Sequence, residues 1–150
     1  MRRILKPRRA AATVEFAIIA PVVVLIMIGM LVGGMGIFRY QQLAHLAREA
    51  SRWASVHGAD YAKATGNSAA TASDVYTTMI QPNAGAMNLG RLSYTVTWNT
   101  DNKPYRTTVV NAKVVRIQNT VTVSITYNWI PEYYLGGVTL GASSCTPMAY

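Results

Sequence analysis

The pattern of apolar and polar residues divides the chain into parts with different periods. An uncharged, mostly apolar run of 23 residues, Phe16–Phe38, comes first. As a helix this run rises about 34 Å at about 1.5 Å per residue, which is enough to cross a hydrocarbon core of about 30 Å. From Tyr40 to about Ala64 apolar residues recur every three or four positions, which predicts that the helix continues as an amphipathic one, ended by glycines. The recurring positions are Leu43, Leu46, Ala47, Ala50, Trp53, Ala54, His57 and Tyr61, with Arg48, Arg52 and Ser55 on the other side.

Beyond residue 70 a short helix and then strands are expected. A capping box formed by Thr71 and Asp74 predicts a helix over Ala72–Gln81, followed by a loop that starts at Pro82. The period then becomes two, which is typical of an antiparallel sheet with one wet face. The expected fold class is therefore α+β, in which a long N-terminal membrane-spanning helix continues as an amphipathic helix packed on a small antiparallel sheet. The strands are expected over residues 92–99, 105–110 and 120–129.

Charge is concentrated before the apolar run, where five cations stand within the first nine positions. By the positive-inside rule the N-terminus stays in the cytoplasm and the chain beyond the run lies outside the membrane. This predicts a basic leader (1–10), a membrane-spanning helix (11–38) and an exported α+β domain (39–150). The net charge of +8 falls to +3 over residues 11–150, without a concentrated basic patch, so nucleic acid is not an expected partner.

The apolar run is expected to be a retained membrane anchor. The alternative is a cleaved secretory signal, in which Val32-Gly33-Gly34 would be the small-residue cleavage site. The run exceeds the usual apolar length of about 7–15 residues in such signals, which favours the anchor. Gly29 and Gly33 are four residues apart and share one helix face, where small residues allow a neighbouring membrane helix to approach closely.

Glu15 is unusual because it heads the apolar run, where a carboxylate contributes nothing to insertion. At this position it can mark the water interface or suit the positive end of the helix dipole. The surrounding stretch, from Arg8-Arg9-Ala10-Ala11 through Glu15-Phe16-Ala17 to Pro21, resembles the N-terminus of TadE-like proteins, the pseudopilins of tight-adherence (Flp-type) pili. The Ala- and Arg-rich stretch 43–52 and the C-terminal residues 127–148 also resemble this family, which implies a final small-residue strand over about 136–144.

The resemblance implies a processing step and a set of partners. A prepilin peptidase would cut between Ala10 and Ala11, although Ala10 stands where the family prefers glycine. Glu15 would then be the fifth residue of the mature chain, followed by Phe16. The implied function is that of a minor pilin-like subunit or assembly factor, supporting pilus biogenesis, adhesion and biofilm formation. The implied partners are the bacterial inner membrane, the peptidase, a major pilin and other pseudopilins.

The inventory of reactive side chains is poor, so neither an enzyme nor a cofactor is expected. No metal-binding, phosphate-cradling or nucleophile motif is present, and the two histidines, His45 and His57, are twelve residues apart. Cys145 is the only cysteine and is expected to be buried, with pairing between subunits as the alternative. Tyr133 and Tyr134 are the best candidates for an exposed contact surface. The alternative function is a permanently membrane-anchored exported binding domain unrelated to a pilus.

Overall fold

The computed structural model describes residues 8–100, 102–130 and 136–149, and of residues 8–10 the backbone only. The chain forms two compact units, Met1–Ile37 and Phe38–Tyr150. A long N-terminal apolar helix is followed by a small antiparallel sheet region, which confirms the predicted α+β fold class. The assignment of residues 1–10, 11–38 and 39–150 to a leader, a membrane helix and an exported domain stays a prediction.

Helix α1 (Arg8–Val56) covers the apolar run and most of the amphipathic stretch. The helix predicted to about Ala64 is not continuous: it is interrupted at Gly58, one of the glycines expected to weaken it, and restarts as α2 (Ala59–Thr65). Gly58 has an extended backbone (φ −85°, ψ −161°) that lies outside the helical region. Gly66 ends α2 at φ 74°, a conformation that glycine adopts without steric cost, and its N–H donates to the carbonyl of Ala62.

A second helical segment follows as α3 (Ala72–Val75), a π-helical turn η1 (Tyr76–Ile80) and α4 (Gln81–Asn83). The predicted capping box is confirmed, since the Asp74 N–H donates to Thr71 Oγ1 and the Thr71 N–H donates to Asp74 Oδ2 at 2.8 Å. The loop predicted from Pro82 begins two residues later, because Pro82 and Asn83 belong to α4. The following residues, 84–86, lie outside the helix as predicted. A short 3₁₀ turn, η2 (Leu89–Arg91), leads into the sheet.

Asp74→Ala is expected to lower the melting temperature at neutral pH, with the loss disappearing in acid. The side-chain and backbone hydrogen bonds from Thr71 favour the ionised carboxylate and hold the pKa of Asp74 below its ordinary value of 3.8. A lowered folded-state pKa contributes stability above the unfolded value that is lost as the pH falls through the folded value. Thermal unfolding followed by circular dichroism between pH 2 and 7 measures the effect. The exposed neighbour Ser73→Ala serves as the control, and an equal loss at every pH would contradict this account.

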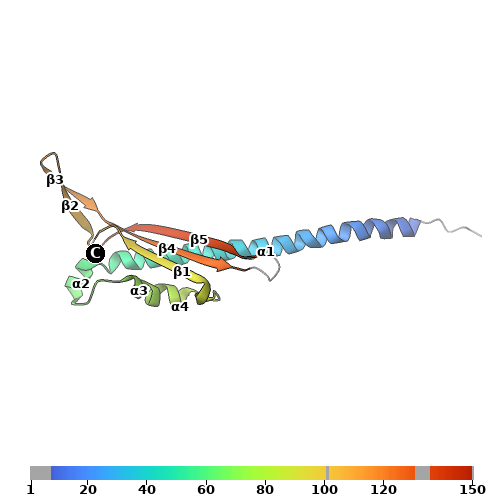
Figure 1. Ribbon diagram of the computed structural model, residues 1–150, viewed down its shortest axis with the longest axis horizontal. Helices are drawn as coiled ribbons and strands as arrows, with labels where there is room; N and C mark the ends of the chain where they lie inside the picture. The colour runs from blue at the N-terminus through green and yellow to red at the C-terminus, as the bar shows by residue number, and fades with distance from the viewer. Residues whose placement is uncertain (1–7, 101, 131–135, 150) are drawn as a thin grey trace, which may run out of the picture. The chain divides into compact units, whose positions relative to one another are not determined.

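Three antiparallel strands form the main sheet in the order β1 (Leu92–Trp98), β4 (Thr120–Trp129), β5 (Val138–Pro147). Figure 1 shows these strands lying along the C-terminal part of α1. The register places Tyr94 opposite Ile125, and Ile125 opposite Ala142. The inward residues of β4 are buried and their neighbours are not, as the alternation predicts.

The apolar sheet face packs on α1 and on the α3–α4 segment, as expected for two elements that cannot bury their apolar stripes alone. Three fully buried alanines of α1, Ala47, Ala50 and Ala54, allow the sheet to approach closely. Ser51 is also buried, and its Oγ lies 2.8 Å from Ser144 Oγ and 2.9 Å from Thr146 Oγ1 on β5. The placement of Ser55 on the polar side is wrong: it is buried, and its carbonyl accepts the Ala149 N–H.

The opposite face of the main sheet carries small, mostly polar side chains. Cys145 belongs to this face, opposite Thr122, and is exposed. The expectation that Cys145 is buried is therefore wrong. The strand alternation decides its position, because Ser144 and Thr146 on either side face α1 and Cys145 must point the other way.

A separate two-stranded hairpin, β2 (Tyr105–Val110) and β3 (Lys113–Gln118), leaves the main sheet beside the C-terminal end of the chain (Figure 1). Strand β2 matches its prediction, whereas the sequence patterns gave no indication of β3. Asn111 and Ala112 form the turn with φ of 51° and 60°. Positive φ at both central residues is typical of a type I′ hairpin turn, for which Asn-Gly is the common signal and Asn-Ala is not.

Candidate assembly helix and surface sites

The N-terminal unit consists of the α1 residues up to Ile37, and its apolar side chains are unburied wherever the structure describes them. Phe16 is 71% exposed and Met30 72% exposed, and none of the described side chains of residues 11–37 is buried. In the described part of the chain, α1 is the one helix long and apolar enough to cross a membrane. Exposed apolar surface of this extent is unstable in water, which supports membrane anchoring, although a signal sequence shares this property.

The helix places the predicted assembly residues on one stripe. At about 100° per residue, Gly33 lies five turns after Glu15 on the same side, and Gly29 lies within about 40° of that line. A side chain built at Gly29 or Gly33 would meet nothing within 4 Å, so both glycines leave open space on the helix surface. Glu15 is exposed at the head of this stripe. A neighbouring helix could thus contact the carboxylate and the glycines together, and the assembly role of these residues stays a prediction.

The predicted cleavage region lies at the start of α1. Ala10 and Ala11 both have helical backbone, Ala11 is exposed, and the Ala10 side chain falls outside the described residues. A peptidase needs an extended segment to align the scissile bond, so cleavage requires this first turn to open. Helix ends fray readily, because their first four N–H groups have no partner within the helix. The site at Ala10-Ala11 remains a prediction.

Within the described residues, no group of three or more His, Cys, Asp or Glu side chains lies close enough together to hold a metal ion. His57 stacks on Trp53 with ring centroids 4.0 Å apart, and its Nδ1 lies 2.9 Å from the Trp53 carbonyl. His57 therefore packs at the end of α1, whereas His45 is exposed. Tyr133 and Tyr134, predicted as a contact surface, lie outside the described residues.

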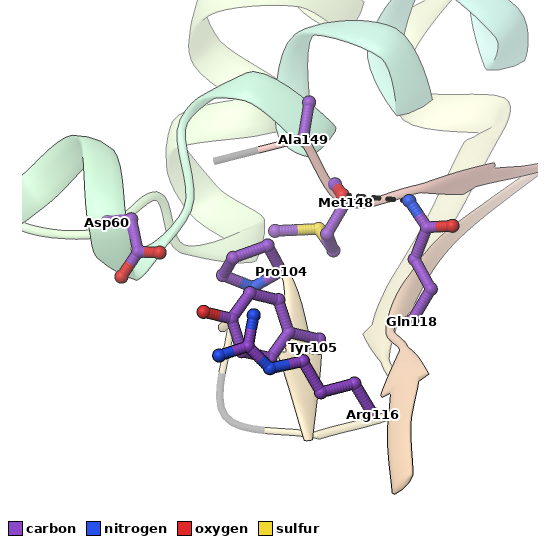
Figure 2. Close-up of a pocket in the computed structure, with 7 residues that line it drawn as sticks. All are labelled: Asp60, Pro104, Tyr105, Arg116, Gln118, Met148 and Ala149. Carbon is purple, nitrogen blue, oxygen red and sulfur yellow. Dashed lines mark hydrogen bonds between the residues drawn. The ribbon is translucent and has the colours of Figure 1, made fainter. Parts of the chain in front are cut away.

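Two hollows lie at the root of the β2–β3 hairpin, where residues 104–107 meet residues 116–119, and no sequence pattern indicated either of them. The first, about 530 Å³, is shown in Figure 2, where Arg116 lies over the ring of Tyr105 with its Cζ 4.5 Å from the ring centroid. The second, about 370 Å³, is more polar. No motif marks these hollows because their walls come from separate segments. The first is lined by Asp60, Pro104, Tyr105, Arg116, Gln118, Met148 and Ala149, and the second by Thr100, Lys103, Tyr105, Arg106, Thr107 and Asn119.

The fold is that of an α+β protein that begins with one long apolar helix. A comparison with protein families finds a match to this part of the chain. The family model TadE, described as TadE-like protein, matches residues 10–52. The match confirms the resemblance drawn from the stretch around Glu15, and it covers the apolar run and the first part of the amphipathic helix. A TadE-like segment indicates involvement with the tight-adherence (Flp-type) pilus system. Searches of curated proteins and of solved structures found no match.

Proposed function

We propose that this chain is a minor pilin-like subunit or assembly factor of a tight-adherence pilus, which acts through assembly rather than catalysis. In this proposal Phe16–Phe38 spans the bacterial inner membrane, the basic leader is cytoplasmic and residues 39–150 lie outside. The partners are a prepilin peptidase, a major pilin and other pseudopilins. The TadE-like match over residues 10–52 supports the connection with such a pilus.

The single observation that carries the proposal is the exposed carboxylate of Glu15 on an apolar, exposed helix, in line with Gly29 and Gly33. An unpaired acid at the centre of a membrane costs about 2.5–3.5 kcal/mol on insertion scales. Cleavage before Ala11 would create an α-amino group with an ordinary pKa of about 7.7–8.0, which is largely cationic at neutral pH. Pairing of this amine with Glu15 of a neighbouring subunit reduces the cost of burying either charge in a helix bundle.

Removal of the leader also weakens the cytoplasmic anchor. The five leader cations hold the N-terminus on the inner face of the membrane, where anionic lipids attract them by about 1 kcal/mol per residue. A chain that begins at Ala11 lacks all five, so its extraction from the bilayer into an assembly is easier. Processing and assembly are therefore coupled in the proposed function.

The proposal predicts that mature protein from cells begins at Ala11. Mass spectrometry of the full chain purified from membranes measures the N-terminus directly. Ala10→Leu is expected to block cleavage, because the family's cut follows a small residue, and Ala17→Leu is the control because it makes the same change beyond the cut. Assembled material that retains residues 1–10 would contradict the proposal and would favour a permanently anchored exported binding domain.

A further inference from the structure

We propose that the β2–β3 hairpin is a docking arm for an acidic segment of a partner protein. The inference uses the described residues Thr100 and 102–119. It goes beyond the proposed pilus function, since it applies to any domain that carries this hairpin. The partner is defined by its chemistry: a polypeptide that supplies carboxylates and backbone N–H groups together with some apolar side chains.

Charge is the first argument for an acidic partner. The hairpin strands and their turn, residues 105–118, contain three cations, Arg106, Lys113 and Arg116, and no acid. The rest of residues 38–150 has six cations and five acids, so three of the four net positive charges of this unit arise from the hairpin. Such a concentrated field attracts acidic surfaces and raises their rate of association.

Exposed apolar surface is the second argument. Val109 is 68% exposed and Val114 65% exposed, and these two residues lie opposite each other near the turn. Every residue of β3 is exposed, and so is every residue of β2 except Thr108. A two-stranded hairpin is marginally stable in water, and exposed apolar residues on it indicate a surface that a partner covers.

The root of the hairpin is nevertheless held firmly, so the arm is presented in a defined position. Asn119 is 1% exposed, its Nδ2 donates to the Lys103 carbonyl at 2.7 Å, and its N–H donates to the Pro104 carbonyl at 2.9 Å. The Met148 N–H donates to the Asn119 carbonyl at 2.8 Å, which ties the root to the end of the chain. A preorganised arm loses less conformational entropy when it binds.

Two buried polar atoms at this root have no hydrogen-bond partner in the described structure: Asn119 Oδ1 and Thr100 Oγ1. Both residues line the hollow of about 370 Å³, and Arg106 is another of its lining residues. A buried unsatisfied polar group costs about 1–3 kcal/mol, so a ligand that supplies its partner gains affinity. A peptide offers N–H donors for the polar groups of this wall and a carboxylate for Arg106 in the same segment.

The hollow of about 530 Å³ at the hairpin root also suits a carboxylate. The Arg116 guanidinium rests on the Tyr105 ring, which holds it in place and leaves its N–H edge available (Figure 2). Asp60 is the one acid among the residues that line the two hollows, and its Oδ1 lies 3.9 Å from Lys63 Nζ. A guanidinium fork binds a carboxylate through two parallel hydrogen bonds.

The distribution of side chains favours a protein over a lipid surface or a second copy of this chain. The pairing register puts Val109, Val114 and Arg116 on one face of the hairpin and Val110, Lys113 and Ile117 on the other. A segment that lies on a membrane separates an apolar face from a cationic one, whereas in this hairpin each face carries both kinds of residue. A second copy brings three more hairpin cations and no hairpin acid, so two hairpins repel each other.

Site-specific cross-linking tests the proposal in cells that make the full chain. A photoreactive amino acid in place of Val109 is expected to cross-link to a protein whose contact segment, identified by mass spectrometry, is acidic. The same amino acid in place of Ser93, exposed on the main sheet, is the position control. Cross-links only to lipid, only to another copy of this chain, or to no molecule would overturn the proposal.

Charge reversal then tests the chemistry of the contact. Arg106→Glu combined with Lys113→Glu is expected to reduce the cross-link at least fivefold, and acid-to-lysine changes in the partner segment should restore it. Arg48→Glu combined with Arg91→Glu makes the same net change at exposed residues outside the hairpin and should leave the yield unaltered. Equal losses in both double variants, with no rescue by the partner, would overturn the proposal. Circular dichroism verifies that each variant is folded.

Discussion

Replacement of Glu15 by valine is expected to reduce incorporation of this chain into pilus assemblies at least tenfold, while membrane insertion stays normal. The valine removes the carboxylate that would pair with a new α-amino group but keeps the apolar character that insertion requires. A tenfold loss corresponds to about 1.4 kcal/mol, which is modest for a charge pair formed within a helix bundle. Quantitative detection of the chain in sheared pili and in membranes separates assembly from insertion.

Two further variants make the Glu15 experiment specific. Glu15→Gln keeps the size and polarity of the side chain and removes only its charge, so it should fail in assembly as Glu15→Val does. Glu49→Gln removes a carboxylate from the second unit and should assemble normally. If Glu15→Val assembles as well as the unaltered chain, the helix is a plain anchor and the second unit has another function.

Ile125→Ala is expected to cause a large loss of stability, about 2–5 kcal/mol in the free energy of unfolding. Ile125 is fully buried in the central strand, between Tyr94 on β1 and Ala142 on β5. Truncation removes buried apolar atoms and leaves a cavity that sheet and helix cannot easily close, because both sides are fixed by hydrogen bonding. Denaturant unfolding of the full chain in detergent, followed by tryptophan fluorescence, measures the change.

The next residue along the strand provides the matched control. Thr126 is exposed on the opposite face of β4, so Thr126→Ala is expected to change stability by less than about 1 kcal/mol. Similar losses for Ile125→Ala and Thr126→Ala would show that the face of β4 carrying Ile125 is not the buried one. The Ile125 result is independent of the pilus proposal, since it concerns only the core of the second unit.

The proposal for the hairpin and the prediction for Glu15 can be contradicted independently of each other. Loss of assembly in Glu15→Val with an unchanged hairpin cross-link would place the helix in the fibre and leave the arm with a separate partner. Loss of the cross-link alone, in the hairpin double variant, would show that the second unit has a contact that assembly does not require. The two sets of variants therefore distinguish an assembly helix from a recognition surface in one chain.

The amino-acid sequence by itself determined the parts of this protein that depend on local pattern. A long apolar run, strict alternation over Thr120–Trp129 and a Thr71–Asp74 capping box predict a helix, a strand and a helix start from neighbouring residues alone. The alignment of the candidate assembly residues also follows from the sequence alone, because helix geometry fixes Glu15, Gly29 and Gly33 relative to one another.

Only the tertiary structure decided the features that combine distant segments. Ser51 and Ser55 are buried because β5 and the C-terminal residues cover that side of α1, and Cys145 is exposed because its neighbours face the helix. Strand β3 depends on a turn with positive φ at Asn111 and Ala112, which the Asn-Ala pair does not signal. The hollows at the hairpin root join residues from up to four separate stretches of chain. Local periodicity specifies which face of an element is apolar, whereas the partner of that face is chosen by packing across the whole chain.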